Sequence, residues 1–104
     1  MTTDDILSIF SDTRSGTMRR VNKALEALGL AQDDVDFVRG DGYFYLGGYS
    51  GAVLPESAIY TYRVGHQTVG EWIDSIFYLL TEQSEYLSSD ARAVVERVSA
   101  ARGK

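Results

Sequence analysis

The histidine and the carboxylates are the side chains through which this chain could do catalytic chemistry. The sequence has 104 residues, with one histidine, no cysteine and 15 Asp and Glu. His66 lies in a Gly-His-Gln turn before a predicted helix, and no Gly-x-Ser-x-Gly motif accompanies it. We therefore interpret His66 as a turn residue rather than a general base, and we predict no catalytic residue.

Three aspartates lie close enough in sequence to hold a hard cation. Asp33, Asp34 and Asp36 do not have the spacing of a twelve-residue calcium loop, so we interpret them as an acidic turn. The lack of cysteine excludes a disulfide scaffold and any zinc or iron–sulfur site with cysteine ligands. We predict no metal and no cofactor.

The glycines do not form a phosphate-binding motif. Neither Gly-x-Gly-x-x-Gly before a helix nor a Walker loop with its lysine occurs among Gly40, Gly42, Gly47, Gly48 and Gly51. Gly40-Asp41-Gly42 is instead typical of a hairpin turn, because glycine tolerates positive φ.

Tyrosines form the most informative pattern. Ten of the twelve aromatic residues lie between Phe37 and Tyr78. Because strand side chains alternate, Tyr43 and Tyr45 share one side of a strand, and Tyr60 and Tyr62 share one side of the next. Three interpretations remain open: the tyrosines stabilise the sheet as cross-strand pairs, the sheet is covered on both faces, or the tyrosines form a platform that contacts a partner.

The elements that would position these residues follow from periodicity. Apolar spacing predicts helices over 4–11, 17–29, 69–82 and 90–102, and alternation predicts strands over 35–39, 43–49 and 58–64. Thr3 and Gly29 are candidate caps, and Thr68 with Glu71 has the spacing of a capping box. The expected fold is a single α+β domain over residues 1–104: a three-stranded antiparallel β-meander packed with N- and C-terminal helices, in the order ααβββαα.

Charge is unevenly distributed. The formal net charge is −5, but the span from Ala24 to Asp90 holds eleven acidic and two basic residues, a net charge of −9. Either each helix has a solvated charged face, or an acidic middle attracts a basic partner. The first ten residues lack the pattern of a signal peptide, and the longest uncharged stretch is too short and Gly-rich to span a membrane, so we expect a cytoplasmic protein.

Three segments resemble a group of small uncharacterised bacterial proteins associated with plasmids and phages. They are 38–45 (VRGDGYFY), 55–63 (PESAIYTYR) and 68–72 (TVGEW), and the similarity covers about residues 20–80. The resemblance implies a mobile-element context, in which small acidic proteins often act as inhibitors of host defence, such as anti-CRISPR proteins. It implies no activity, cofactor or catalytic residue.

The leading hypothesis is a non-enzymatic protein-binding module that occludes a basic, nucleic-acid-binding surface of a partner protein. Direct binding of nucleic acid by the acidic span is not expected, and a homo-oligomer is compatible with the predicted sheet edges. The expected partner-binding residues are Tyr43, Tyr45, Tyr60 and Tyr62 for contact, and Asp33, Asp34, Asp36 and Asp41 for electrostatic attraction. The alternatives are a nucleic-acid-associated accessory module that uses the basic segment 14–23, and a small enzyme with a site at His66.

Overall fold

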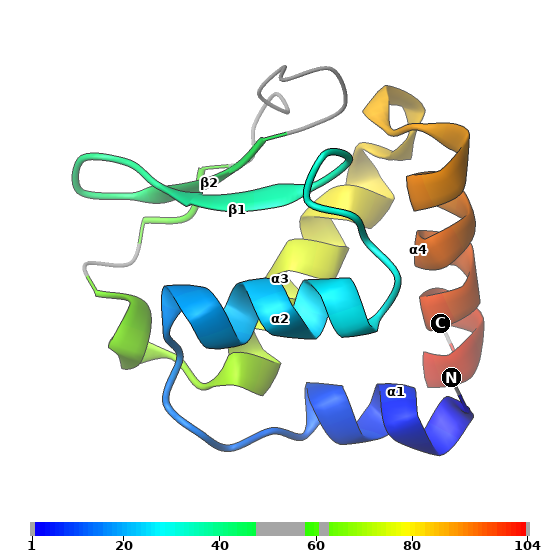
Figure 1. The fold of residues 1–104 in the computed structure, drawn as a ribbon, viewed down its shortest axis with the longest axis horizontal. Helices are drawn as coiled ribbons and strands as arrows, with labels where there is room; N and C mark the ends of the chain where they lie inside the picture. The colour runs from blue at the N-terminus through cyan, green and yellow to red at the C-terminus, as the bar shows by residue number, and fades with distance from the viewer. Residues whose placement is uncertain (1, 48–57, 61–62, 104) are drawn as a thin grey trace.

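A computed structural model describes residues 2–47, 58–60 and 63–103. These residues form four α-helices and a two-stranded antiparallel sheet, an α+β architecture (Figure 1). The element bounds are α1 (Thr3–Phe10), α2 (Met18–Ala27), β1 (Asp36–Arg39), β2 (Phe44–Gly47), α3 (Val69–Glu82) and α4 (Ser89–Arg102), with short 3₁₀ helices η2 (Val64–His66) and η3 (Ser84–Tyr86).

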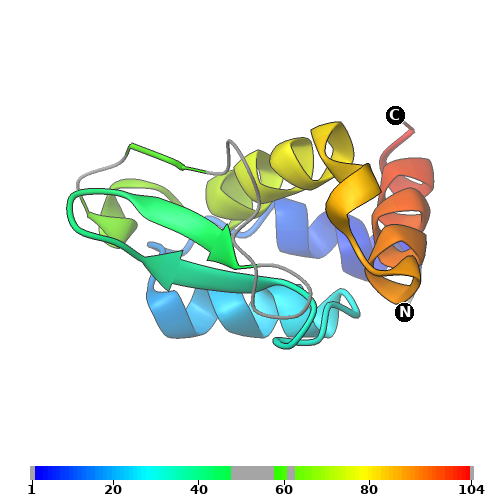
Figure 2. The ribbon, with the colours of Figure 1, turned by 90° about the horizontal axis from the view of Figure 1, so that it is seen from above.

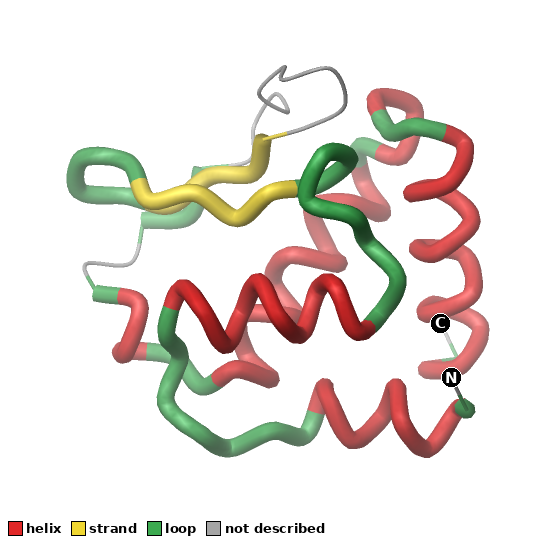
Figure 3. Tube along the Cα trace, in the orientation of Figure 1, coloured by secondary structure: helices red, strands yellow, loops and turns green. Residues whose placement is uncertain are grey.

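Helix α3 is the centre of the fold and packs against α1, α2 and α4. The hairpin of β1 and β2 lies along α2 on one side of the molecule, as Figures 1 and 2 show from two directions. The core is one cluster to which all four helices and both strands contribute. Figure 3 shows the hairpin strands and the helices of the described residues in separate colours.

Most helix boundaries agree with the sequence patterns. Thr68 and Glu71 form the predicted capping box, and α3 ends at Glu82 as expected. Gly29 has φ +104° just after α2, where a glycine is favoured. The prediction of Thr3 as the first cap is wrong, because α1 is capped by Thr2. The Thr2 hydroxyl accepts from Asp5 N–H, and the Asp5 carboxylate accepts from Thr2 N–H, which together make a capping box.

Backbone N–H groups in the first turn of α3 donate hydrogen bonds to a segment far away in the sequence. The connector 12–16 runs beside the start of α3, where Val69 N–H donates to the Arg14 carbonyl and Gly70 N–H to the Asp12 carbonyl. Gly16 N–H donates back to the Gln67 carbonyl at 2.8 Å. Helix N-termini carry N–H groups without intrahelical partners, so this pairing both completes α3 and fixes the connector.

The sheet register separates the two faces of the hairpin. Phe37 pairs with Leu46, and both are buried against the helices, whereas Val38 pairs with Tyr45 on the opposite face. Gly42, at φ +81°, makes the turn that the Gly-Asp-Gly pattern predicted.

Both edges of the hairpin are occupied by other parts of the chain. On the β1 edge, Asn22 of α2 accepts from Phe37 N–H and donates to the Phe37 carbonyl. On the β2 edge, Phe44 and Ile59 exchange two backbone hydrogen bonds of 2.9 and 2.7 Å. The expected third strand over 58–64 is thus represented by an isolated bridge at Ile59. Residues 48–49 of the second predicted strand and 61–62 of the third lie outside the described residues, and Val64 belongs to η2 instead.

Candidate functional site

Three tyrosines gather on the outer face of the hairpin. We call Tyr43, Tyr45 and Tyr60 the tyrosine face. The ring centroids of Tyr43 and Tyr45 are 5.8 Å apart, and those of Tyr43 and Tyr60 are 6.2 Å apart. Phe44 and Leu46 point to the core, so the alternation predicted from sequence places the tyrosines on the solvent side. Tyr62 lies outside the described residues.

The tyrosine face is open to solvent to different degrees. Tyr60 is 83% exposed, while Tyr43 and Tyr45 are half-buried. The rings contact each other in tilted arrangements and keep part of their surfaces accessible. The group is a rigid aromatic surface of the kind that protein partners contact.

The four candidate attracting aspartates divide into two groups. Asp33, Asp34 and Asp36 lie at the start of β1, where Asp36 accepts from the Gln32 side-chain amide at 3.4 Å. Asp33 is exposed, and Asp34 and Asp36 are half-buried. Asp41 lies at the other end, in the hairpin turn. Across the described residues, no group of three or more His, Asp or Glu side chains is arranged to hold a metal ion.

A polar pocket opens beside the hairpin turn, and sequence reasoning missed it. We call it the hairpin-turn pocket. Its volume is about 790 Å³, and its lining comes from three separate segments: Gly16, residues 39–44 and residues 63–66. Arg39, Arg63 and His66 line it together with Asp41. No local motif reveals such a site, because the basic side chains come from different elements.

A second, more apolar groove runs between α3 and α4. Its volume is about 480 Å³, and Ile59, Phe77, Tyr78 and Val98 are among its lining residues. Arg102 of α4 crosses it to pair with Asp74 of α3.

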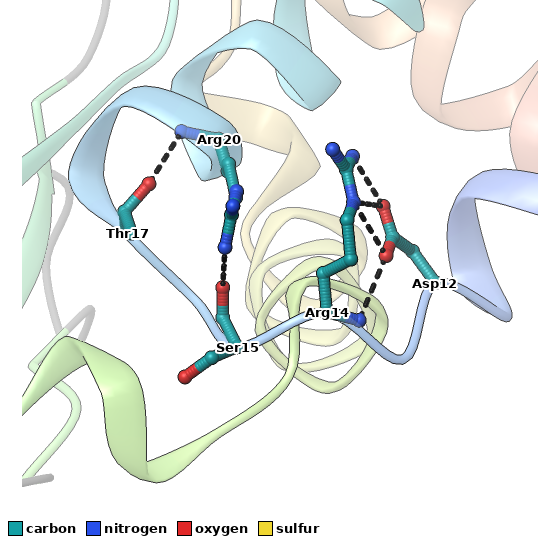
Figure 4. Close-up of polar contacts among 5 residues, drawn as sticks. All are labelled: Asp12, Arg14, Ser15, Thr17 and Arg20. Carbon is teal, nitrogen blue, oxygen red and sulfur yellow. Dashed lines mark hydrogen bonds and ion pairs between the residues drawn. The ribbon is translucent and has the colours of Figure 1, made fainter.

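Two arginines of the basic segment 14–23 form hydrogen bonds with nearby residues of the chain (Figure 4). Arg14 holds Asp12 through several hydrogen bonds, the shortest 2.7 Å, and Arg20 donates to the Ser15 carbonyl at 3.0 Å. Arg19 and Lys23 are exposed on α2. The hydrogen bonds from the Arg14 side chain lower the pKa of the Asp12 carboxyl below its ordinary value.

This ion pair predicts a small pH dependence of stability. A carboxyl whose pKa is lower in the folded chain stabilises the fold above its unfolded pKa of about 4, and this contribution is lost as pH falls through the folded pKa. We expect Asp12→Asn to destabilise the chain at pH 7 by less than about 1 kcal/mol, and by less still at pH 3. Urea unfolding of both proteins at the two pH values measures this, and an equal loss at both would contradict the assignment.

Within the described parts of the chain, no helix is long and apolar enough to cross a membrane. A scan against protein-family models and searches of curated proteins and of solved structures find no match to this chain.

Proposed function

We propose that this chain is a non-enzymatic protein-binding module that docks through its tyrosine face on a basic surface of a partner protein. The observation that carries the proposal is the grouping of Tyr43, Tyr45 and Tyr60 on the side of the hairpin that faces away from the core. Tyrosines supply large contact area at little cost in side-chain entropy, and they are enriched where interfaces are strongest.

The charge beside this face indicates the kind of partner. Asp33, Asp34 and Asp36 lie within four residues of each other at the start of β1, and Asp36 is on the same side of the sheet as Val38 and Tyr45. Such a group raises the rate of encounter with a positively charged surface. Asp41 is the exception, because it lines the hairpin-turn pocket together with Arg39 and Arg63, where its charge is offset.

The segment at the β2 edge extends the same surface. The bridge between Ile59 and Phe44 at the β2 edge places Tyr60 on the same face as Tyr43. The partner's basic surface would then be covered by the hairpin together with this segment. Nucleic-acid-binding proteins present such surfaces, so docking in the cytoplasm would compete sterically with their nucleic acid. An anti-CRISPR-like inhibitor is one form of this proposal, and its support is the motif resemblance alone.

The experiment compares two double variants for binding. The immobilised chain captures proteins from a bacterial lysate, and the affinity of a captured, purified partner is then measured. We expect Tyr45→Ala with Tyr60→Ala to weaken binding by about 30-fold or more, since truncating a strongly contacting residue costs about 2 kcal/mol. The matched control is Tyr78→Ala with Tyr86→Ala, which removes two exposed tyrosines outside the hairpin.

Salt supplies the second test. Attraction between exposed charges is screened within about 10 Å at 0.1 M salt, so the association rate should fall as ionic strength rises. Asp33→Asn with Asp36→Asn should lower this rate at low salt and reduce its dependence on salt. Equal loss of affinity in the two tyrosine double variants, or a rate independent of salt, contradicts the proposal.

A further inference from the structure

We propose that the hairpin-turn pocket binds the phosphate group of a small, nucleotide-sized molecule. Among its described lining residues are three basic side chains, Arg39, Arg63 and His66, and one carboxylate, Asp41. Between Ala24 and Asp90 the sequence has two arginines and no lysine, and both arginines line this pocket. In an otherwise acidic span, the fold therefore brings the positive charge together at one point.

The walls of the pocket are held by the core and need no rearrangement to form. Trp72 is fully buried and contacts the ring of Phe44, which belongs to the hairpin wall. Its indole N–H donates to the Val64 carbonyl at 2.7 Å, which fixes η2, the opposite wall. Gly16 lies against the same indole and the same carbonyl, where a Cβ would come within 2.6 Å of the ring. A preformed site avoids the cost of ordering on binding.

The side chains in the pocket have the chemistry to hold a phosphate. The guanidinium of Arg39 lies 5.7 Å from the centroid of the Phe44 ring, at cation–π distance. Arginine binds phosphate oxygens with two parallel hydrogen bonds, and a second arginine, Arg63, lines the same pocket. Gly40, Gly42 and Gly65 also line the pocket, and they have no side chains that would keep an anion away from the backbone.

The size of the pocket indicates more than inorganic phosphate. A volume of about 790 Å³ lies within the range of pockets that take small-molecule ligands. Tyr43 is also among the lining residues, and its ring packs over Gly40 on the tyrosine face, where a Cβ would come within 2.7 Å of it. The two arginines would hold the phosphate, and the remaining volume suits the rest of a phosphate monoester such as a nucleotide.

This site is separate from the surface of the proposed function. It lies at the turn of the hairpin, with Tyr43 as the one residue that belongs to both, and its charge has the opposite sign to that of the aspartates near the start of β1. Phosphate binding can therefore be tested without any protein partner. Failure of one proposal leaves the other standing.

Nuclear magnetic resonance gives a direct test with inorganic phosphate and adenosine monophosphate as probes. In a ¹⁵N-labelled sample at low salt, we expect saturable shifts of the amide signals of Gly16, Gly40, Gly42 and Gly65. Arg39→Gln and Arg63→Gln should each weaken binding by about tenfold. Lys23→Gln removes the same charge from an exposed position of α2 that does not line the pocket, and should change binding by less than about twofold.

The pocket carboxylate provides a variant that should gain affinity. Asp41→Asn removes the negative charge found among the described lining residues, so phosphate binding should tighten several-fold, whereas Asp33→Asn should have little effect. Tighter binding of adenosine monophosphate than of phosphate identifies a nucleotide-sized ligand, and equal affinity identifies the free anion as the source of the phosphate group. Absence of saturable shifts up to about 10 mM of either probe, or equal affinities in Arg39→Gln and Lys23→Gln, overturns the proposal.

Discussion

Trp72→Ala should destabilise the chain by about 3–5 kcal/mol, the largest loss we expect from a single substitution. The indole is fully buried, and its ring centroid lies 5.0 Å from those of both Phe37 and Phe44. Alanine would leave a cavity among these rings and remove the donor to the Val64 carbonyl. Small domains have a total stability of about 5–15 kcal/mol, so this loss would take a large part of it.

Urea unfolding followed by far-UV circular dichroism measures this effect. Tyr78→Ala is the matched control, since Tyr78 is on the same helix but 66% exposed, and it should change stability by less than about 0.5 kcal/mol. Trp72→Phe keeps an aromatic ring and removes the indole N–H, so its loss should lie between the two. A loss of stability below about 1 kcal/mol for Trp72→Ala would mean that the cluster of Trp72, Phe37 and Phe44 does not contribute strongly to the stability of the fold.

The second large effect should come from a single added methyl group at Gly70. On an exposed helix, replacing glycine by alanine stabilises by up to about 1 kcal/mol. At Gly70 the new Cβ would stand 2.4 Å from the Phe10 carbonyl oxygen and 3.0 Å from that of Asp12, both of them backbone atoms. We therefore expect the opposite sign, a loss of about 1–3 kcal/mol, because α3 would have to separate from the end of α1 and from the connector.

Gly65→Ala is the control for this prediction. Its Cβ would meet the Ser15 hydroxyl at 3.4 Å, an ordinary contact, and Gly65 has no positive φ. Thermal unfolding should show a clear decrease in melting temperature for Gly70→Ala and a much smaller change for Gly65→Ala. A Gly70→Ala protein as stable as the natural chain would show that the connector does not approach α3 as closely as the structure indicates.

The helices and the hairpin turn could be predicted because their signals are local. Capping at Thr68 depends on Glu71 three residues later, and the turn at Gly42 depends on a backbone angle that glycine tolerates. The sidedness of Tyr43 and Tyr45 follows from strand alternation in the same way. Such features need only neighbouring residues, so they can be read without knowledge of the rest of the chain.

The edges of the sheet depended on contacts that sequence does not show. A strand edge can be covered by any group that offers a donor and an acceptor, and here Asn22 of α2 does so for Phe37. At the other edge the backbone of Ile59 meets Phe44, and within the described residues this bridge stands where a longer strand was expected. Neither partner is marked by a local pattern.

The sequence alone determined the helices, the turn, the alternation of tyrosines and core residues in the hairpin, and the acidic character of the span from Ala24 to Asp90. Only the tertiary structure brought Tyr60 beside Tyr43, and Arg39 into one pocket with Arg63 and His66. The physical reason is that backbone preferences and side-chain periodicity act over a few residues. A surface or a pocket is made by segments that meet when Trp72 and its neighbours are buried together.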